Sequence, residues 1–397
     1  MNAVSTAPRD LQAMHIADIS LFFAPHSGGV KRYLLAKHAH LAARTGVRHS
    51  LLVPGATSAE IEPGIFTRGD WNIPCAGGYR VPLRPARWRR ALAALRPDVI
   101  EVGDPYHLAW AALAAARDCG AMTVAFAHSD LPRMIASRFG RLAGRAADAY
   151  LRRLYSRFDL VQAPSRLIAQ RLRDSGIARI VVQPLGVDAE VFHPARRDAG
   201  LREQLGLDGD VRLSIFAGRM AREKDVPLLL RTFARLGPRH HLILVGGERR
   251  EALSSNATLL PYEQDPARLA RLLASADALV HAGAQETFGL IAVEAMACGL
   301  PVIGVRAGAL PELIDDSVGA LAAAGDAASL GAAIEKVHEG DVAALGRRAR
   351  ARVERRYAWA SVFDLQLDRY ARLLRTREFP AFDDDGTLEP VDATSPP

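Results

Sequence analysis

The chain has 397 residues, of which 49% are hydrophobic and 24% are charged. This composition excludes an intrinsically disordered protein, and the length predicts two domains. The overall charge is +7, but residues 378–397 hold six acidic side chains and no basic one, so residues 1–377 carry +13. A basic body favours an anionic partner, whereas an aromatic content of 6% argues against nucleic acid.

Short apolar runs alternate with helical patterns through the first half of the chain. Helices are predicted at residues 31–44 and 108–118. Strands are predicted at His15–Phe23, Arg48–Val53, Asp98–Val102, Met122–Ala127 and Leu160–Ala163. Strands that alternate with helices are typical of a parallel sheet in a doubly wound α/β fold.

The second half repeats this scheme, which predicts two similar α/β domains facing each other. Its strands are predicted at Val211–Ala217, Leu242–Val245, Ala278–His281 and Pro301–Val305. Pro and Gly residues in Gln183–Pro194 mark the connector between the halves. We expect domains at residues 1–187 and 188–356, a final helix at 357–375, and a disordered acidic tail at 376–397.

Two features of the first half lie where ligands bind in such folds, beyond the carboxyl ends of strands. Gly28 and Gly29 follow the first strand, and glycines let a backbone approach a ligand closely. The GxGxxG fingerprint of dinucleotide-binding folds is absent, so an ordinary turn is the alternative. His128 follows the strand 122–127, where either a reacting group or a core histidine is possible.

Two cations follow the first strand of the second half. Arg219 comes directly after the strand 211–217, and Lys224 comes about one turn later. A guanidinium fork and an ammonium group together suit a diphosphate, although two surface cations in a loop are the alternative.

The segment that follows the strand 278–281 carries two glutamates, Glu286 and Glu294, with a predicted helix from Gly289 to about Ala297. The free N–H groups of Phe288, Gly289 and Leu290 at its start can bind an anion. A glycosidase also uses two carboxylates, which stand about 5–9.5 Å apart. Eight helical residues span roughly 12 Å, and a glycosidase does not need the cations at 219 and 224.

Taken together, these segments resemble the retaining GT-B glycosyltransferases of family 4, over roughly residues 14–375. The resemblance rests on an ordered set of motifs: Gly28-Gly29, His128, Ala163–Ser165, Gly186–Asp188 with Phe192 and Pro194, Gly218-Arg219 with Lys224, Glu286 to Glu294, Gly299–Pro301, and Gly308 with Pro311-Glu312.

The resemblance implies two Rossmann-like domains facing a cleft, with the donor on the C-terminal domain, the acceptor on the N-terminal one, and the last helix returning to the first domain. It implies a role for each candidate residue: Arg219 and Lys224 at the donor diphosphate, Glu294 at the ribose, Glu286 at the sugar, Phe288, Gly289 and Leu290 at sugar and phosphate, Gly28 and Gly29 at the phosphates, and His128 beside the reacting sugar.

His128 and Glu286 are thus the expected catalytic residues, and no metal or other cofactor is expected, because the two cations and the helix start stabilise the leaving group. The Asp383–Asp385 run lies in the tail and is not expected to bind metal. The glycine-rich signal after the second strand of this half, Val245–Glu248, departs from the family pattern, so uridine versus guanosine stays open.

The expected reaction moves a hexosyl group from a nucleotide-diphosphate sugar, with a UDP-sugar favoured, to a membrane lipid such as diacylglycerol. The alternative is a GDP-mannose-dependent mannosyltransferase that acts on a polysaccharide or lipopolysaccharide intermediate. Alternatives of other classes are a glycosidase or phosphorylase and a non-catalytic sugar-nucleotide binding protein.

Two arginine-rich segments in the acceptor half predict contact with an anionic membrane. Residues 79–96 hold six arginines and no acid, and residues 133–157 hold seven arginines against one acid. A solvated surface is the alternative, because the chain has 47 arginines and only four lysines. With no predicted signal peptide or membrane span, and with unpaired Cys75, Cys119 and Cys298, we expect a cytoplasmic protein at the inner face of the cell membrane.

Overall fold

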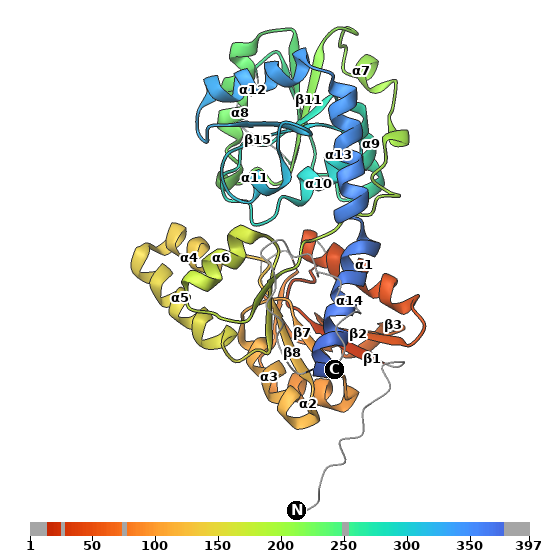
Figure 1. Ribbon diagram of the computed structural model, residues 1–397, viewed down its shortest axis with the longest axis vertical. Coiled ribbons are helices and arrows are strands. Elements are labelled where there is room, and N and C mark those ends of the chain that lie inside the picture. The colour runs from red at the N-terminus through yellow and green to blue at the C-terminus, as the bar shows by residue number, and fades with distance from the viewer. Residues whose placement is uncertain (1–13, 25–27, 74–77, 248–253, 377–397) are drawn as a thin grey trace, which may run out of the picture. The chain divides into compact units, whose positions relative to one another are not determined.

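The computed structural model describes residues 14–24, 28–73, 78–247 and 254–376 (Figure 1). Cys75, Glu248 and the acidic tail with Asp383–Asp385 lie outside the described residues. The chain divides into two compact units, unit 1 with Met1–Pro184 and Phe363–Pro397, and unit 2 with Leu185–Val362.

Unit 1 is built on a sheet of eight strands in the order β10-β9-β8-β7-β1-β2-β4-β3. Its pairs are parallel except for β3 with β4 at one edge. Two short antiparallel strands, β5 and β6, form a separate ribbon. The strands are β1 (Met14–Ile19), β2 (Val47–Gly55), β3 (Ala59–Glu62), β4 (Ile65–Gly69), β5 (Trp71–Asn72), β6 (Arg80–Val81), β7 (Val99–Val102), β8 (Met122–Phe126), β9 (Leu160–Ala163) and β10 (Ile180–Val182).

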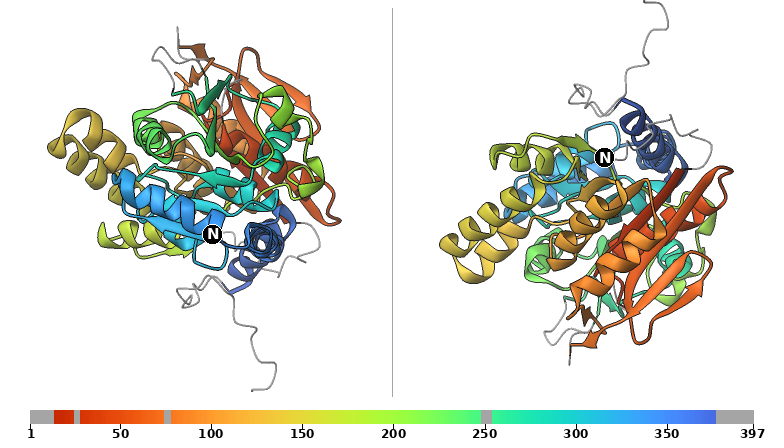
Figure 2. Two further views of the ribbon diagram at one scale, coloured as in Figure 1. Left: turned by 90° about the horizontal axis from the view of Figure 1, so that it is seen from above. Right: turned by 90° about the horizontal axis from the view of Figure 1, so that it is seen from below.

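Helices connect these strands and cover the sheet (Figures 1 and 2). They are α1 (Gly29–Ala42), α2 (Pro85–Leu95), α3 (His107–Cys119), α4 (Leu131–Phe139), α5 (Arg141–Tyr155) and α6 (Arg166–Asp174). The last helix, α14 (Trp359–Thr376), begins in unit 2 and belongs to unit 1 from Phe363 onward. No helix of the described residues has the length and apolar character needed to cross a bilayer.

Unit 2 is a doubly wound parallel sheet of six strands in the order β13-β12-β11-β14-β15-β16. The strands are β11 (Arg212–Ala217), β12 (His240–Val245), β13 (Ala257–Leu260), β14 (Ala278–Val280), β15 (Val302–Val305) and β16 (Gly319–Ala322). The helices are α7 (Leu201–Gln204), α8 (Val226–Leu236), α9 (Pro266–Ser275), α10 (Leu290–Ala297), α11 (Leu310–Leu313), α12 (Ala327–Glu339) and α13 (Val342–Arg356), with short 3-10 turns η2 (Pro194–Arg196) and η3 (Arg222–Lys224).

The central strand β11 shows why both faces of this sheet are covered. Side chains alternate along a strand, so Leu213 and Ile215 join the core beneath α9, α10 and α13, and Phe216 joins the core beneath α8 and α12. The helices lie on opposite faces of the sheet in Figure 1. Such strands are buried on both sides, as their continuous apolar runs predict.

A buried ion network joins four elements of unit 1. The Lys37 ammonium of α1 is fully buried and lies 3.0 Å from an Asp18 oxygen on β1 and 2.6 Å from a Glu101 oxygen on β7. From α14, the Tyr370 hydroxyl donates to Glu101, and the Gln366 amide donates to it at 3.1 Å. Burial lowers the pKa of Lys37, but the two carboxylates outweigh burial and raise that pKa above its ordinary value.

We predict that this network, and not surface ion pairs, holds α14 in unit 1. Lys37→Met should reduce the free energy of unfolding by about 3–5 kcal/mol, because it leaves buried carboxylates uncompensated. Arg44→Ala is the matched control: Arg44 also bonds α14, through Asp364, but both side chains are half-exposed. It should cost less than about 1 kcal/mol. Urea unfolding measures both, and equal losses would contradict the prediction.

Candidate functional site

The carboxyl ends of β11, β14 and β15 bring three loops of unit 2 together. Arg219 and Lys224 lie on the loop after β11, with Lys224 at the end of η3. Glu286 lies on the loop between β14 and α10. Since ligands of open α/β sheets bind outside these strand ends, the loops form the candidate site.

Glu286 is held by two cationic or proton-donating groups. The Lys224 ammonium forms an ion pair with Glu286 Oε1, and His281 Nε2 lies 3.1 Å from the same oxygen. The Gly283 N–H donates to His281 Nδ1 at 3.1 Å, so Nδ1 is an acceptor and the neutral imidazole carries its proton on Nε2, facing Glu286. The Nε2 contact is close without being a well-aligned hydrogen bond.

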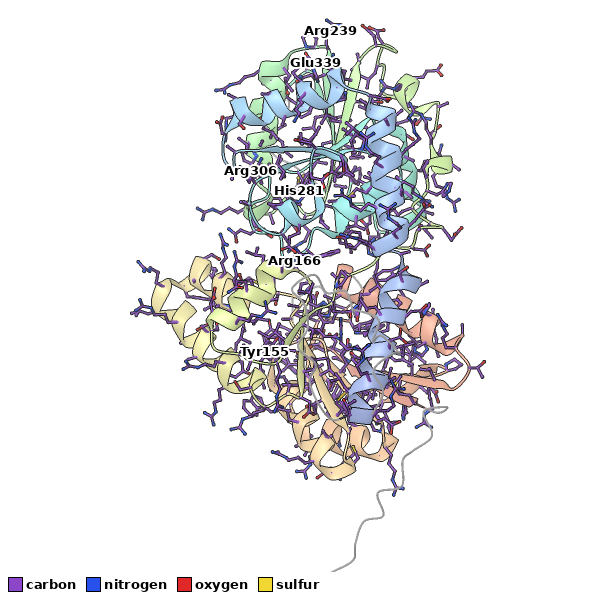
Figure 3. All side chains as sticks on the ribbon, in the orientation of Figure 1. Tyr155, Arg166, Arg239, His281, Arg306 and Glu339 are labelled. Carbon is purple, nitrogen blue, oxygen red and sulfur yellow. The ribbon has the colours of Figure 1, made fainter. Side chains whose placement is uncertain are left out.

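These contacts fix the charge of Glu286. Burial raises the pKa of this carboxyl, but His281 and Lys224 outweigh burial and hold the pKa at about 2. Glu286 is therefore ionised at every pH at which the protein would be assayed, and it can accept hydrogen bonds from hydroxyl groups. His281, whose side chain lies in the interior of unit 2 (Figure 3), is a positioning residue that sequence reasoning missed.

Glycines let the loops around Glu286 pack closely. A Cβ on Gly308, whose φ is 61°, would lie 2.9 Å from the backbone nitrogen of Glu286. The Ala309 N–H donates to the Glu286 carbonyl at 2.9 Å. A Cβ on Gly283 would lie 2.9 Å from the carbonyl oxygen of Glu223. A side chain at either glycine would displace the loops that carry Lys224 and Glu286.

The start of α10 has the form expected of an anion site. Gly289 precedes the helix with a φ of 98°, and no side chain caps the helix. Its first N–H groups therefore remain able to bind an anion. Leu290 is the first helical residue, and Phe288 is buried against Tyr357, with ring centroids 5.9 Å apart. Glu294 lies inside α10 and is only 2% exposed.

Arg219 differs from Lys224 in its surroundings. Its side chain is 75% exposed and lies 3.3 Å from Glu223, four residues along the chain. The structure thus joins Lys224 to Glu286 but leaves Arg219 outside this ion pair.

The candidate residues of unit 1 lie at the corresponding strand ends. Gly28 caps α1, and Gly29 is the first residue of that helix. A Cβ on Gly28 would meet no atom of the protein within 4 Å, so internal packing does not require glycine here. His128 follows β8, stacks on Phe126 at 4.0 Å and makes an edge contact with Tyr33. Burial, and secondarily the Lys37 charge, lower the pKa of His128 to about 3, so this imidazole is neutral.

Two further polar residues lie beside His128 and were not predicted. A Cβ on Gly103 would lie 3.2 Å from the Ser20 side chain and 3.7 Å from His128 Nε2. The next residue, Asp104, accepts the Leu21 N–H at 2.6 Å, and burial raises the pKa of its carboxyl to about 6. Asp104 lies two residues after the end of the predicted strand 98–102, and this position was the signal that would have found it.

No three His, Cys, Asp or Glu side chains among the described residues form a group that would hold a metal ion. What the geometry offers is charge: a cation, an ionised carboxylate and a helix start in unit 2, and a neutral histidine in unit 1. Cations and a helix start bind phosphates, and carboxylates bind sugar hydroxyls.

Comparison with known proteins identifies the family of this chain. Residues 27–191 match the family model "Glycosyltransferase Family 4", and residues 199–355 match "Glycosyl transferases group 1". The chain is 33% identical over 327 residues to a GDP-mannose-dependent alpha-(1-6)-phosphatidylinositol dimannoside mannosyltransferase of Mycobacterium tuberculosis, covering 78% of this chain and 84% of that relative. The chain belongs to the family 4 glycosyltransferases.

Another relative of this glycosyltransferase is a GDP-mannose-dependent alpha-mannosyltransferase of Mycolicibacterium smegmatis, 34% identical over 76% of this chain and 82% of that one. Among solved structures, sucrose-phosphate synthase of Thermosynechococcus elongatus superposes with a TM-score of 0.76 at 22% identity, covering 92% of this chain and all of that one. This likeness confirms the predicted GT-B fold. The glycosyltransferase is thus an enzyme that transfers sugars, as expected from its motifs.

For this glycosyltransferase, we predict that Lys224→Ala and Arg219→Ala each lower kcat/KM by about 10²–10³, as expected for loss of a transition-state donor. Arg222→Ala is the matched control, because Arg222 is a neighbouring exposed cation on η3 without an ion pair to Glu286. It should keep kcat/KM within about threefold. Steady-state kinetics, with circular dichroism as a folding check, decides. Near-normal kcat/KM in the Arg219 and Lys224 variants would make these residues ordinary surface cations.

Proposed function

We propose that this glycosyltransferase is a GDP-mannose-dependent α-mannosyltransferase that acts on an anionic lipid. The observation that carries the proposal is that two relatives, at 33% and 34% identity, are named as GDP-mannose-dependent mannosyltransferases. These relatives favour the GDP-mannose alternative over the UDP-sugar and diacylglycerol expected first. A lipid acceptor remains in the proposal, because the name of one relative includes phosphatidylinositol dimannoside.

A hollow of about 470 Å³ at the end of β13 supports guanine as the base. Its lining includes Tyr262, Glu263 and Gln264. Guanine presents N1–H and an amino group side by side, and a carboxylate accepts from both, whereas uracil has a single N–H. One Glu263 oxygen accepts the Asp265 N–H at 2.8 Å, and the other oxygen remains for the base.

The proposed chemistry retains the α configuration of the donor. The bond from C1 of mannose to the phosphate oxygen breaks, and the acceptor oxygen bonds C1 from the same face. The acceptor proton passes to the departing phosphate oxygen. Lys224, Arg219 and the start of α10 stabilise the charge that develops on the diphosphate, so no divalent ion is required. Glu286 orients the sugar through its hydroxyls. The role proposed for the neutral His128 is to approach the reacting carbon without adding a charge.

The helical pair α4–α5 offers a membrane contact for a lipid acceptor. Phe139 ends α4 with 67% of its surface exposed, and Leu142 near the start of α5 is 79% exposed. Arg138, Arg141 and Arg145 accompany them in the same two helices. Apolar side chains flanked by arginines are typical of proteins that bind anionic bilayers.

A donor screen tests the proposed reaction. We expect wild-type protein with a bacterial lipid extract to transfer label from GDP-mannose to a lipid fraction and release GDP, with little transfer from UDP-glucose or UDP-galactose. Activity should persist in EDTA. Preference for a UDP-sugar would contradict the proposed donor. Loss of activity in EDTA and its restoration by Mg²⁺ would contradict the metal-free site. Binding of GDP-mannose without turnover would indicate a sensor.

Vesicle co-sedimentation tests the membrane contact. Phe139→Ser with Leu142→Ser should weaken binding to phosphatidylglycerol vesicles by about tenfold or more, because each buried side chain contributes roughly 1.5–3 kcal/mol. Trp71→Ser is the control, since Trp71 is a similarly exposed aromatic on β5, outside α4 and α5. Binding should fall with salt. If wild type ignores these vesicles at low salt, a soluble or carrier-bound glycan becomes the better acceptor.

A further inference from the structure

Three helices of unit 1 line an open hollow of about 450 Å³. Its lining runs from Ser129 and Asp130, before α4, across one side of α5 to Ser175, after α6. Figure 2 shows the α4–α5 pair projecting at the side of unit 1, and α6 lies beside it in Figure 1. The volume falls within the roughly 300–1,000 Å³ of small-ligand sites and is larger than a phosphate ion needs.

Four arginines line this hollow, and three of them have no internal partner. Arg171 is bound to Asp130 at 2.5 Å. The guanidinium groups of Arg133, Arg141 and Arg145 make no hydrogen bond or ion pair with any residue that the structure describes. Uncompensated guanidinium groups gathered in one concave surface favour a phosphate, which they bind through paired N–H donors.

The same hollow also offers acceptors for hydroxyl groups. Asp148 accepts the Ser175 hydroxyl at 2.5 Å, and Asp174 accepts the Gln170 amide at 2.8 Å. Each carboxylate keeps acceptor capacity, because two carboxylate oxygens provide about four lone-pair sites. A simple anion would be repelled by these carboxylates, whereas a ligand with both a phosphate and several hydroxyls satisfies both sets of groups.

The surroundings of the hollow indicate a lipid as the source of that ligand. The exposed Phe139 and Leu142 lie where α4 turns into α5, on the two helices that carry Arg133, Arg141 and Arg145. His128 directly precedes Ser129, so the backbone at one end of the hollow continues into this histidine.

We propose that this hollow binds the phosphorylated polyol headgroup of the anionic lipid acceptor. The proposal rests on the proposed function for the word acceptor, but the binding site itself is defined by the arginines and carboxylates of unit 1. The phosphodiester contacts Arg133, Arg141 and Arg145, the polyol hydroxyls donate to Asp148 and Asp174, and a hydroxyl of the polyol is presented toward His128.

Two triple variants with the same loss of charge test the site. The pocket variant combines Arg133→Gln, Arg141→Gln and Arg145→Gln. The control combines Arg152→Gln, Arg153→Gln and Arg157→Gln, which remove exposed arginines in α5 and just after it that do not line the hollow. Calorimetric titration with glycerophosphoinositol should show binding to wild type and control, and about 10- to 100-fold weaker binding to the pocket variant, as expected for lost hydrogen bonds to a charged group.

Two further probes distinguish the headgroup from simpler sources of charge. Inorganic phosphate should bind wild type much more weakly than glycerophosphoinositol. Phosphatidylcholine vesicles that contain phosphatidylinositol should bind better than vesicles with the same fraction of phosphatidylserine, which has the same net charge but no polyol. The pocket variant should lose this preference and the control should keep it. The proposal is overturned if wild type binds inorganic phosphate as tightly as glycerophosphoinositol, or binds both kinds of vesicle equally. It is also overturned if the pocket and control variants behave alike.

GDP titration separates this proposal from the proposed function. Both triple variants should bind GDP as wild type does, because the donor residues Lys224 and Glu286 belong to unit 2. Suppose that neither wild type nor the variants bind GDP or GDP-mannose, while glycerophosphoinositol binding depends on the three pocket arginines. The proposed mannosyltransferase function is then wrong, and the headgroup site stands. GDP-mannose turnover with no headgroup binding overturns the site alone.

Discussion

The Lys37 ammonium is the constraint around which unit 1 is organised. It lies between Asp18 and Glu101 on neighbouring strands β1 and β7, and the Glu101 carboxylate also accepts from Tyr370 and Gln366 of α14. Without the ammonium, two carboxylates would be buried side by side, which is strongly unfavourable. Because the last helix supplies donors to the same carboxylate, residues more than 250 positions apart in sequence form one charge-balanced cluster.

The charge of this cluster also acts on His128, a candidate site residue of unit 1. Tyr33 contacts the His128 ring and hydrogen-bonds Gln366 of the buried ion network. The Lys37 charge adds to burial in lowering the pKa of His128. In unit 2 the compensated carboxylate belongs to the candidate site itself, since Lys224 forms an ion pair with Glu286. In the proposed reaction, an arriving diphosphate competes with Glu286 for the Lys224 ammonium, which couples the positions of phosphate and sugar.

Periodicity and strand-end chemistry predicted much of the fold. The strand 160–163 coincides with β9, because a mostly apolar run of four residues is long enough for a strand and too short for a buried helix. The first strand was predicted to extend to Phe23, but β1 ends at Ile19 and the chain turns so that the Leu21 N–H bonds Asp104. The ribbon β5–β6 and the hairpin β3–β4 were missed, since these strands are short and lack a continuous apolar run.

Charged groups were the harder part of the site. In a sequence, Lys37 and Glu101 look like surface residues, because burial comes from partners that lie far away along the chain. For the same reason, nothing in the sequence indicated that the candidate residues Lys224 and Glu286 would form an ion pair or that His281 would contact it. Glycine positions were more informative: Gly289 and Gly308 adopt left-handed backbone conformations that few other residues adopt without strain.

The scarcity of lysine makes amine chemistry unusually selective on this protein. Only Lys31, Lys37, Lys224 and Lys336 carry side-chain amines. Lys37 is sealed inside unit 1, and Lys224 is mostly covered and bound to Glu286, whereas 63% of the Lys336 side chain is open to solvent. An activated ester will therefore acylate Lys336 well before Lys224. Since α12 carries Lys336 and none of the candidate site residues, a fluorophore or a surface linker can be attached there without modifying the candidate site of unit 2.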